Sequence, residues 1–136
     1  MHKIFNKCIE LANALFEPNY EARCQVFSFG FYGNCLLAVG RNKIKTHTWN
    51  VRNPLVFKNT GEIYKNKGIC AECHLFLQIK NKTNIPYKEI KVINVRITKD
   101  RTIKNSRPCS SCSNWLKVLQ PKFLYFTNDL GIFERY

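Results

Sequence analysis

Two segments, Cys70-Ala71-Glu72 and Pro108-Cys109-Ser110-Ser111-Cys112, decide how the second half of this chain folds. Each opens a run in which apolar side chains recur at helical spacing, and each places thiols at that opening. The backbone N–H groups and the positive dipole end of a helix N-terminus favour thiolate. The two segments therefore predict two helices that begin with three thiols able to meet at one ion.

The other elements follow from apolar periodicity and turn residues. A strand that leads into a helix and back to a strand implies a parallel pair. Only residues 128–131 precede the last strand, so it should run antiparallel to its predecessor. The sequence predicts one α/β domain over 1–136, with a mixed five-stranded sheet flanked by helices. The expected helices cover 4–16, 70–81 and the stretch between Pro108 and Pro121, and the expected strands cover 24–29, 35–39 (an antiparallel pair), 90–97, 123–127 and a last strand from Ile132.

The composition indicates a single ordered domain. The chain has 136 residues and is 45% apolar, which is enough for one core. No apolar run approaches the roughly 20 residues that span a bilayer, and residues 1–7 lack the features of a secretion signal. The seven cysteines are odd in number, and two pairs have metal-ligand spacing. We therefore expect reduced thiols in a cytoplasmic protein with no membrane partner.

The net charge of +13 is unevenly distributed. Residues 1–40 are balanced, whereas residues 41–70 hold seven cations against Glu62 alone, and residues 71–107 hold nine cations against three acids. Such a field attracts phosphate, although a solvated lysine-rich surface would have the same composition. The sequence predicts that the basic segment 41–67 contacts substrate phosphate.

Cys70, Cys109 and Cys112 form a ligand set for zinc. Thiolate sulfurs bind zinc tightly, and three protein ligands leave a fourth position for water or substrate. A water in that position loses its proton near neutral pH. Glu72, two residues after the first ligand, is placed to carry protons to and from the reacting group. These residue types predict a zinc cofactor and hydrolytic chemistry.

Cys73 allows a second interpretation. Together with Cys70 it makes another Cys-x-x-Cys pair, so four thiols could close a structural Cys₄ zinc site. The 35 residues between Cys73 and Cys109 exceed the roughly 15–20 of the common four-cysteine pattern. A non-catalytic zinc module therefore stays open beside the three-ligand assignment.

These motifs resemble the cytidine/deoxycytidylate deaminase superfamily, most strongly over residues 35–136. Its members carry, in the same order, counterparts of Gly40-Arg41-Asn42, of both cysteine motifs and of Phe123 to Gly131. The stretch from Gly40 to His47 is also similar to small phage-encoded deaminases, which would act in the host cytoplasm. The chain departs from the pattern at two positions: Cys70 stands in place of the usual histidine, and Cys73 in place of a frequent arginine.

The resemblance implies a cytidine-deaminase-like fold and hydrolytic removal of the amino group from a cytosine-type base. Glu72 would then move protons between water, the ring and the departing amine. Asn42 would bind the substrate sugar, and the backbone of Ala71 would face the base. Helix N-terminal amides and Arg107 would offset the charge of the thiolates. An antiparallel last strand is typical of the nucleoside-type branch, whose small members are often homo-oligomers.

The form in which the base arrives is left open by the sequence. A free nucleoside, a nucleotide and a single strand of DNA or RNA can all present it. The antiparallel last strand favours a small substrate, whereas the basic segment favours one that carries phosphate. The sequence therefore predicts a nucleoside or nucleotide deaminase, with a polynucleotide deaminase as the alternative.

Overall fold

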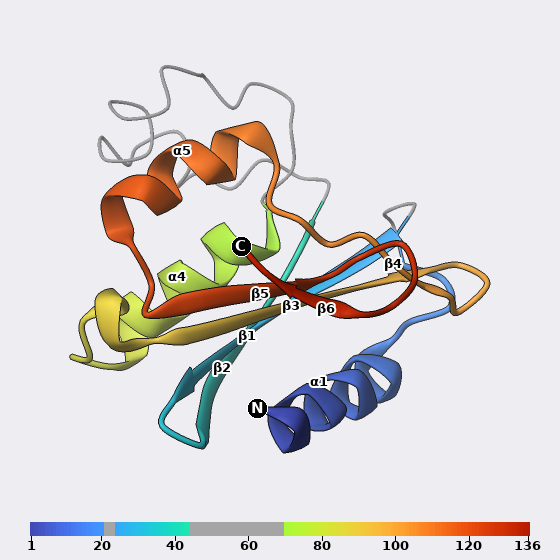
Figure 1. The fold of residues 1–136 in the computed structure, drawn as a ribbon, viewed down its shortest axis with the longest axis horizontal. Coiled ribbons are helices and arrows are strands. Elements are labelled where there is room, and N and C mark those ends of the chain that lie inside the picture. Colours follow the sequence, from blue (N-terminus) through green and yellow to red (C-terminus); the bar gives the residue numbers. More distant parts are fainter. Residues whose placement is uncertain (21–23, 44–69) are drawn as a thin grey trace.

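The computed structural model describes residues 1–20, 24–43 and 70–136 (Figure 1). Within them, no helix combines the length and the apolar character that crossing a bilayer requires. The helices are α1 (His2–Leu15), α4 (Ala71–Lys82), α5 (Ser110–Leu119) and the short 3-10 helix η1 (Tyr87–Glu89). The strands are β1 (Cys24–Tyr32), β2 (Cys35–Arg41), β3 (Lys91–Thr98), β4 (Ile103–Lys104), β5 (Phe123–Thr127) and β6 (Phe133–Arg135).

The strands form one open mixed sheet in the order β2-β1-β3-β5-β6. The sixth strand, β4, is not part of this order and, among the described strands, pairs only with β3. β3 and β5 are parallel, and the other described pairs are antiparallel. The predicted strand directions are thus confirmed. α5 lies on the connection between the parallel strands, and β6 turns back along β5 after a short loop.

The prediction of five strands was wrong by one. The additional strand is β4, whose two residues pair with Arg96 and Ile97 at the end of β3. The connecting turn is closed by the Thr98 N–H, which donates to the Thr102 carbonyl at 3.0 Å. Two residues are too few to produce the apolar alternation that reveals a strand in a sequence.

The β1–β2 hairpin is also tighter than the sequence predicted. Residues 30–34 were expected to form the turn between the strands 24–29 and 35–39, but Gly30, Phe31 and Tyr32 belong to β1, whose register with β2 is irregular between Gly30 and Phe31. The turn consists of Gly33 and Asn34, with Gly33 at a φ of +61°. Phe31 stays in the strand because its side chain is fully buried in the core.

The sheet has two unlike faces (Figure 1). α1 covers one face, and α4 and α5 cover the other. Successive strand residues point to opposite faces, so each strand contributes to both. The α4/α5 face buries an apolar cluster and also the polar side chains of Ser28, Asn94 and Glu72. The α1 face buries an apolar cluster of Cys8, Ala12, Phe16, Phe27, Phe29, Phe31, Ile93, Val95 and Ile97.

β2 approaches the first turn of α4 so closely that Gly40 admits no side chain. A Cβ at this position would lie 2.1 Å from the Ala71 carbonyl oxygen and 2.5 Å from the Leu75 amide nitrogen. Both are backbone atoms, so neither can rotate aside. Gly40 therefore lets β2 pack directly against the helix that begins after Cys70 and carries Glu72.

Candidate metal centre and active site

Cys70 and Cys109 occupy equivalent positions in two helices. Each is the N-cap residue, of α4 and of α5 respectively, and each has extended backbone angles. Cys112 lies in the first turn of α5 and is fully buried. The prediction that both cysteine motifs open helices is confirmed.

The three thiols are close enough to hold one metal ion. Their Sγ atoms all lie within 4.8 Å of one another. Tetrahedral zinc has Zn–S distances of about 2.3 Å, which places neighbouring sulfur atoms roughly 3.8 Å apart. The Sγ atoms of Cys70 and Cys109 are 3.7 Å apart. The donor set and this spacing fit zinc, so the triad could bind a metal ion.

Cys73 lies outside this triad. Among the described residues, the thiols within reach of one ion are those of Cys70, Cys109 and Cys112. The Cys73 side chain is 1% exposed and packs in the apolar cluster of the α4/α5 face. The geometry therefore favours three thiol ligands over a closed site of four.

Cys70 and Cys112 stay protonated in the absence of metal. The Cys109 thiol raises the pKa values of both Cys70 and Cys112 well above the ordinary range of cysteine. Burial and the Glu72 carboxylate act in the same direction. Without metal these two thiols are thus neutral, and an incoming ion has to displace their protons because thiolate is the ligand form.

Glu72 is buried beside the triad, on the first turn of α4. Its side chain is only 4% exposed, which is rare for a carboxylate. Burial raises the pKa of Glu72 to about 7, although hydrogen bonds from the backbone and from the Cys112 thiol oppose the shift. A carboxyl group that exchanges its proton near neutral pH is suited to general acid–base catalysis.

A cavity of about 270 Å³ opens beside the triad and Glu72. It includes the carboxyl-terminal end of β3, which is the end of a strand where open α/β sheets place ligands. The predicted catalytic, metal and substrate-binding residues line this cavity, with the exception of Cys112. The Cys112 Sγ lies within 4.8 Å of those of Cys70 and Cys109, which do line it. The lining residues are Cys24, Val26, Asn42, Cys70, Ala71, Glu72, Arg96, Asn105, Ser106, Arg107 and Cys109.

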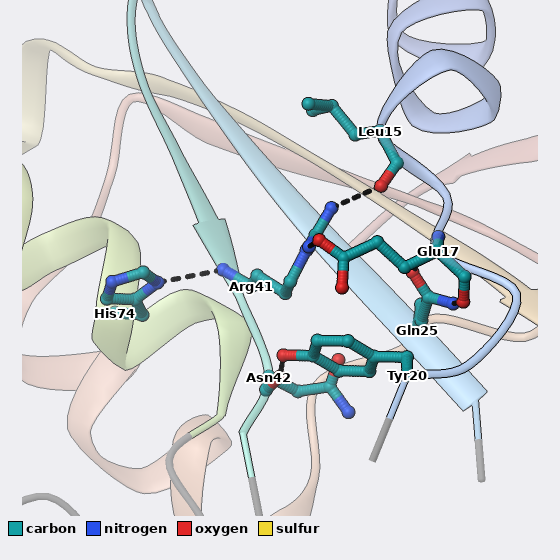
Figure 2. Close-up of polar contacts among 7 residues, drawn as sticks. All are labelled: Leu15, Glu17, Tyr20, Gln25, Arg41, Asn42 and His74. Atoms are coloured by element: carbon teal, nitrogen blue, oxygen red, sulfur yellow. Dashed lines mark hydrogen bonds and ion pairs between the residues drawn. The ribbon is translucent and has the colours of Figure 1, made fainter. Parts of the chain in front are cut away.

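Asn42 borders the cavity, and its side-chain amide is anchored to β1. Its Oδ1 accepts from the Val26 N–H at 2.8 Å, and its Nδ2 donates to the Cys24 carbonyl at 3.1 Å. The Tyr20 hydroxyl donates to the backbone carbonyl of Asn42, and Figure 2 shows the side chains of Tyr20 and Asn42. An amide has two N–H groups and two lone pairs, so each side-chain atom can make one further contact. The sugar contact of Asn42 is compatible with this anchoring and stays a prediction.

Arg41 points towards α1, where it secures the end of β2 (Figure 2). Its guanidinium pairs with the Glu17 carboxylate at 2.8 Å and donates to the Leu15 carbonyl. Its backbone N–H donates to His74 Nδ1 at 2.9 Å, which ties β2 to α4. Arg41 thus has a structural role in the basic segment that was predicted to contact phosphate. Residues 44–67 of that segment lie outside the described residues.

Sequence reasoning missed Arg96, Asn105 and Ser106, which also line the cavity, whereas Arg107, expected to offset the charge of the thiolates, lines it as well. Arg96 interrupts an apolar strand, and this charge was the available signal. Segment 105–107 is held in place by Ser106, whose hydroxyl donates to the Asn94 carbonyl at 2.9 Å and accepts from the Thr127 N–H at 2.8 Å. Bonds between such distant residues leave no local pattern in a sequence.

Comparison with known proteins does not extend these observations. No protein-family model, curated protein or solved structure gives a significant match to this chain. Any assignment of function therefore depends on the motifs and on the geometry of the triad, Glu72 and the cavity.

Proposed function

We propose that this protein is a zinc-dependent hydrolytic deaminase that acts on a cytosine-type base in a nucleoside or nucleotide. The observation that carries the proposal is that three thiols spaced for one zinc ion and the buried Glu72 meet at a common cavity. Three ligands leave a tetrahedral ion one open position, as in catalytic zinc sites. A neighbouring carboxyl that is not a ligand supplies the proton carrier that hydrolysis requires.

In this mechanism the three cysteines bind the metal and Glu72 transfers the protons. Cys70, Cys109 and Cys112 hold the ion, which when bound supplies the Lewis acidity that makes water nucleophilic at neutral pH. Glu72 takes a proton from the attacking water, delivers one to N3 of the base, and passes one to the departing amine. Water thus replaces the amino group at C4, and ammonia leaves.

Two observations support a small cytosine-type substrate. The order of the motifs resembles that of cytidine and deoxycytidylate deaminases. By this resemblance, Asn42 would contact the sugar and the Ala71 backbone would contact the base. Asn42 and Ala71 border the same cavity as Glu72. At about 270 Å³ the cavity is slightly smaller than the usual small-molecule sites of about 300–1,000 Å³. Such a volume suits one nucleoside or nucleotide.

A product assay tests the proposal. Zinc-loaded protein is incubated separately with cytidine, CMP, dCMP, adenosine and a cytosine-containing single-stranded oligonucleotide, and ammonia and the deaminated base are quantified. We expect uracil-type product from a cytosine monomer, loss of turnover on chelation and recovery on addition of zinc. Folded, zinc-loaded protein that converts none of these substrates would refute the proposal and favour a zinc module. Turnover of the oligonucleotide alone would replace it with a polynucleotide deaminase.

A further inference from the structure

Arg96 places a cation on the sheet at the cavity. It lies near the end of β3, paired in register with Val26 of β1 and Lys104 of β4. Asn94 and Val92, two and four residues earlier, are buried on the α4/α5 face, so strand alternation directs Arg96 to the same face. Its Nη1 donates to the Asn105 carbonyl at 3.3 Å, which holds one side of the guanidinium.

The Nε of Arg96 is buried and has no hydrogen-bond partner among the described residues. Buried donors in folded proteins are nearly always satisfied, so an unsatisfied one indicates a partner outside the described residues. A guanidinium presents its N–H groups as a planar fork that matches the oxygens of phosphate. The chemistry of Arg96 therefore suits an anionic group of a ligand in this cavity.

Arg107 adds a second cation to the lining. Its guanidinium stacks over the rings of Phe126 and Tyr136, with distances of 5.3 Å and 5.1 Å to the ring centroids. Its backbone N–H donates to Asn105 Oδ1 at 2.9 Å, so one residue, Asn105, contacts both arginines. Glu72 is the only carboxylate among the described lining residues. The lining of the cavity thus includes two arginines, Arg96 and Arg107.

We propose that Arg96, assisted by Arg107, binds the phosphate of the substrate, so that the enzyme prefers a nucleoside monophosphate to the corresponding nucleoside. This inference rests on the proposed deaminase function and adds a subsite to it. It places a phosphate contact on the sheet and on the segment that precedes Cys109, in addition to the one that the sequence predicted in the basic segment 41–67. The contact of the phosphate with the two arginines would favour the nucleotide over the nucleoside.

Binding of UMP and uridine to the zinc-loaded protein isolates this contribution. The two ligands are products of the proposed reaction, so neither is consumed, and they differ by one phosphate. We expect wild type to bind UMP more tightly than uridine in calorimetric titrations. Arg96→Gln should weaken UMP binding about ten- to a hundredfold and change uridine binding less than about twofold. Arg107→Gln, at an exposed position, should weaken UMP binding by a smaller factor.

Lys99→Gln is the matched control, because it removes one cation from an exposed turn residue that does not line the cavity. It should leave the binding of both ligands unchanged. Equal losses for UMP and uridine in Arg96→Gln would overturn the inference, as would unchanged UMP binding. A loss confined to a single-stranded oligonucleotide would also overturn it and would assign Arg96 to a strand. If Arg96→Gln fails to fold, unchanged UMP binding by Arg107→Gln is the overturning result.

Ammonia release from CMP is measured separately on the same preparations. UMP binding that depends on Arg96, without turnover of CMP or cytidine by wild type, would refute deamination while leaving the phosphate subsite in place. Turnover of CMP and cytidine with equal efficiency, unaffected by Arg96→Gln, would refute the subsite while leaving deamination in place. The two proposals therefore fail in different measurements.

Discussion

The two faces of the sheet differ in whether their cysteines lie close enough together to hold an ion. On the α1 face, Cys8 is fully buried among apolar side chains, and burial raises its pKa to about 12. On the α4/α5 face, three thiols lie within 4.8 Å of one another at the starts of two helices that border a cavity. Cys8 thus serves as a small apolar core residue, whereas Cys70, Cys109 and the buried Cys112 are potential ligands of one ion.

The largest expected effect concerns Glu72, the buried carboxyl of the α4/α5 face. Glu72→Gln keeps the shape of the side chain and removes the proton carrier, so turnover should fall by about 10²- to 10⁴-fold or more. Zinc content and thermal stability should stay close to those of wild type. Steady-state ammonia release measures the effect, with the exposed Glu89→Gln as control. Turnover above about a tenth of wild type would show that Glu72 has no catalytic role.

Zinc stoichiometry separates the thiols of the two faces. Wild type should bind one zinc ion per chain, Cys109→Ser should lose nearly all of it, and Cys8→Ala should retain it, as measured by elemental analysis after dialysis. Cys73→Ala should retain zinc as well, because its thiol lies outside the triad. If Cys73→Ala loses zinc as completely as Cys109→Ser, the site has four thiol ligands and the catalytic assignment fails.

Gly40→Ala tests the packing that holds α4 against the sheet. The new Cβ would meet two backbone atoms at 2.5 Å or less, so we expect destabilisation of about 3 kcal/mol or more. Gly33→Ala is the matched control, because Gly33 has a positive φ but open space around it, and its substitution should cost only about 1–2 kcal/mol. Urea unfolding measures both changes. Equal losses would mean that β2 and α4 are not in close contact.

The smallest expected effect is the contribution of Cys8 to the pH dependence of the free energy of unfolding. Its pKa in the folded chain, about 12, lies above the ordinary thiol value of about 8.5. The folded state therefore retains the proton where the unfolded state has lost it. The associated stability is fully present below pH 8.5 or so, and it is lost as the pH rises towards 12. Cys8→Ala should flatten this alkaline decline in urea unfolding between roughly pH 8.5 and 10.5.

Labelling with iodoacetamide checks the same thiol directly. In folded wild type at pH 8.5, the exposed Cys35 should react quickly and Cys8 should stay unmodified. Coincident pH profiles for wild type and Cys8→Ala, together with rapid labelling of Cys8, would show that the α1 face does not shield its cysteine.

The elements predicted best are those with local signals at both ends. Pro108 and Pro121 bracket α5, and the short loop 128–131 made the antiparallel direction of β6 predictable. The two errors, the missing β4 and the β1–β2 turn drawn too long, have different causes. β4 is too short to show apolar alternation, whereas the length of β1 depends on the core contacts of Phe31, which the sequence does not record.

The sequence by itself determined the chemistry available to this protein, because residue type and spacing set which thiols share a helix N-terminus and which carboxyl lies beside them. The tertiary structure alone decided what converges. It brings the Sγ atoms of Cys70 and Cys109, which are 39 residues apart in the sequence, to 3.7 Å from each other. It also leaves Cys73 in the apolar core. It also buries the Nε of Arg96 at the same cavity. Local patterns arise from one segment's own periodicity, whereas convergence requires the sheet that packs distant segments together.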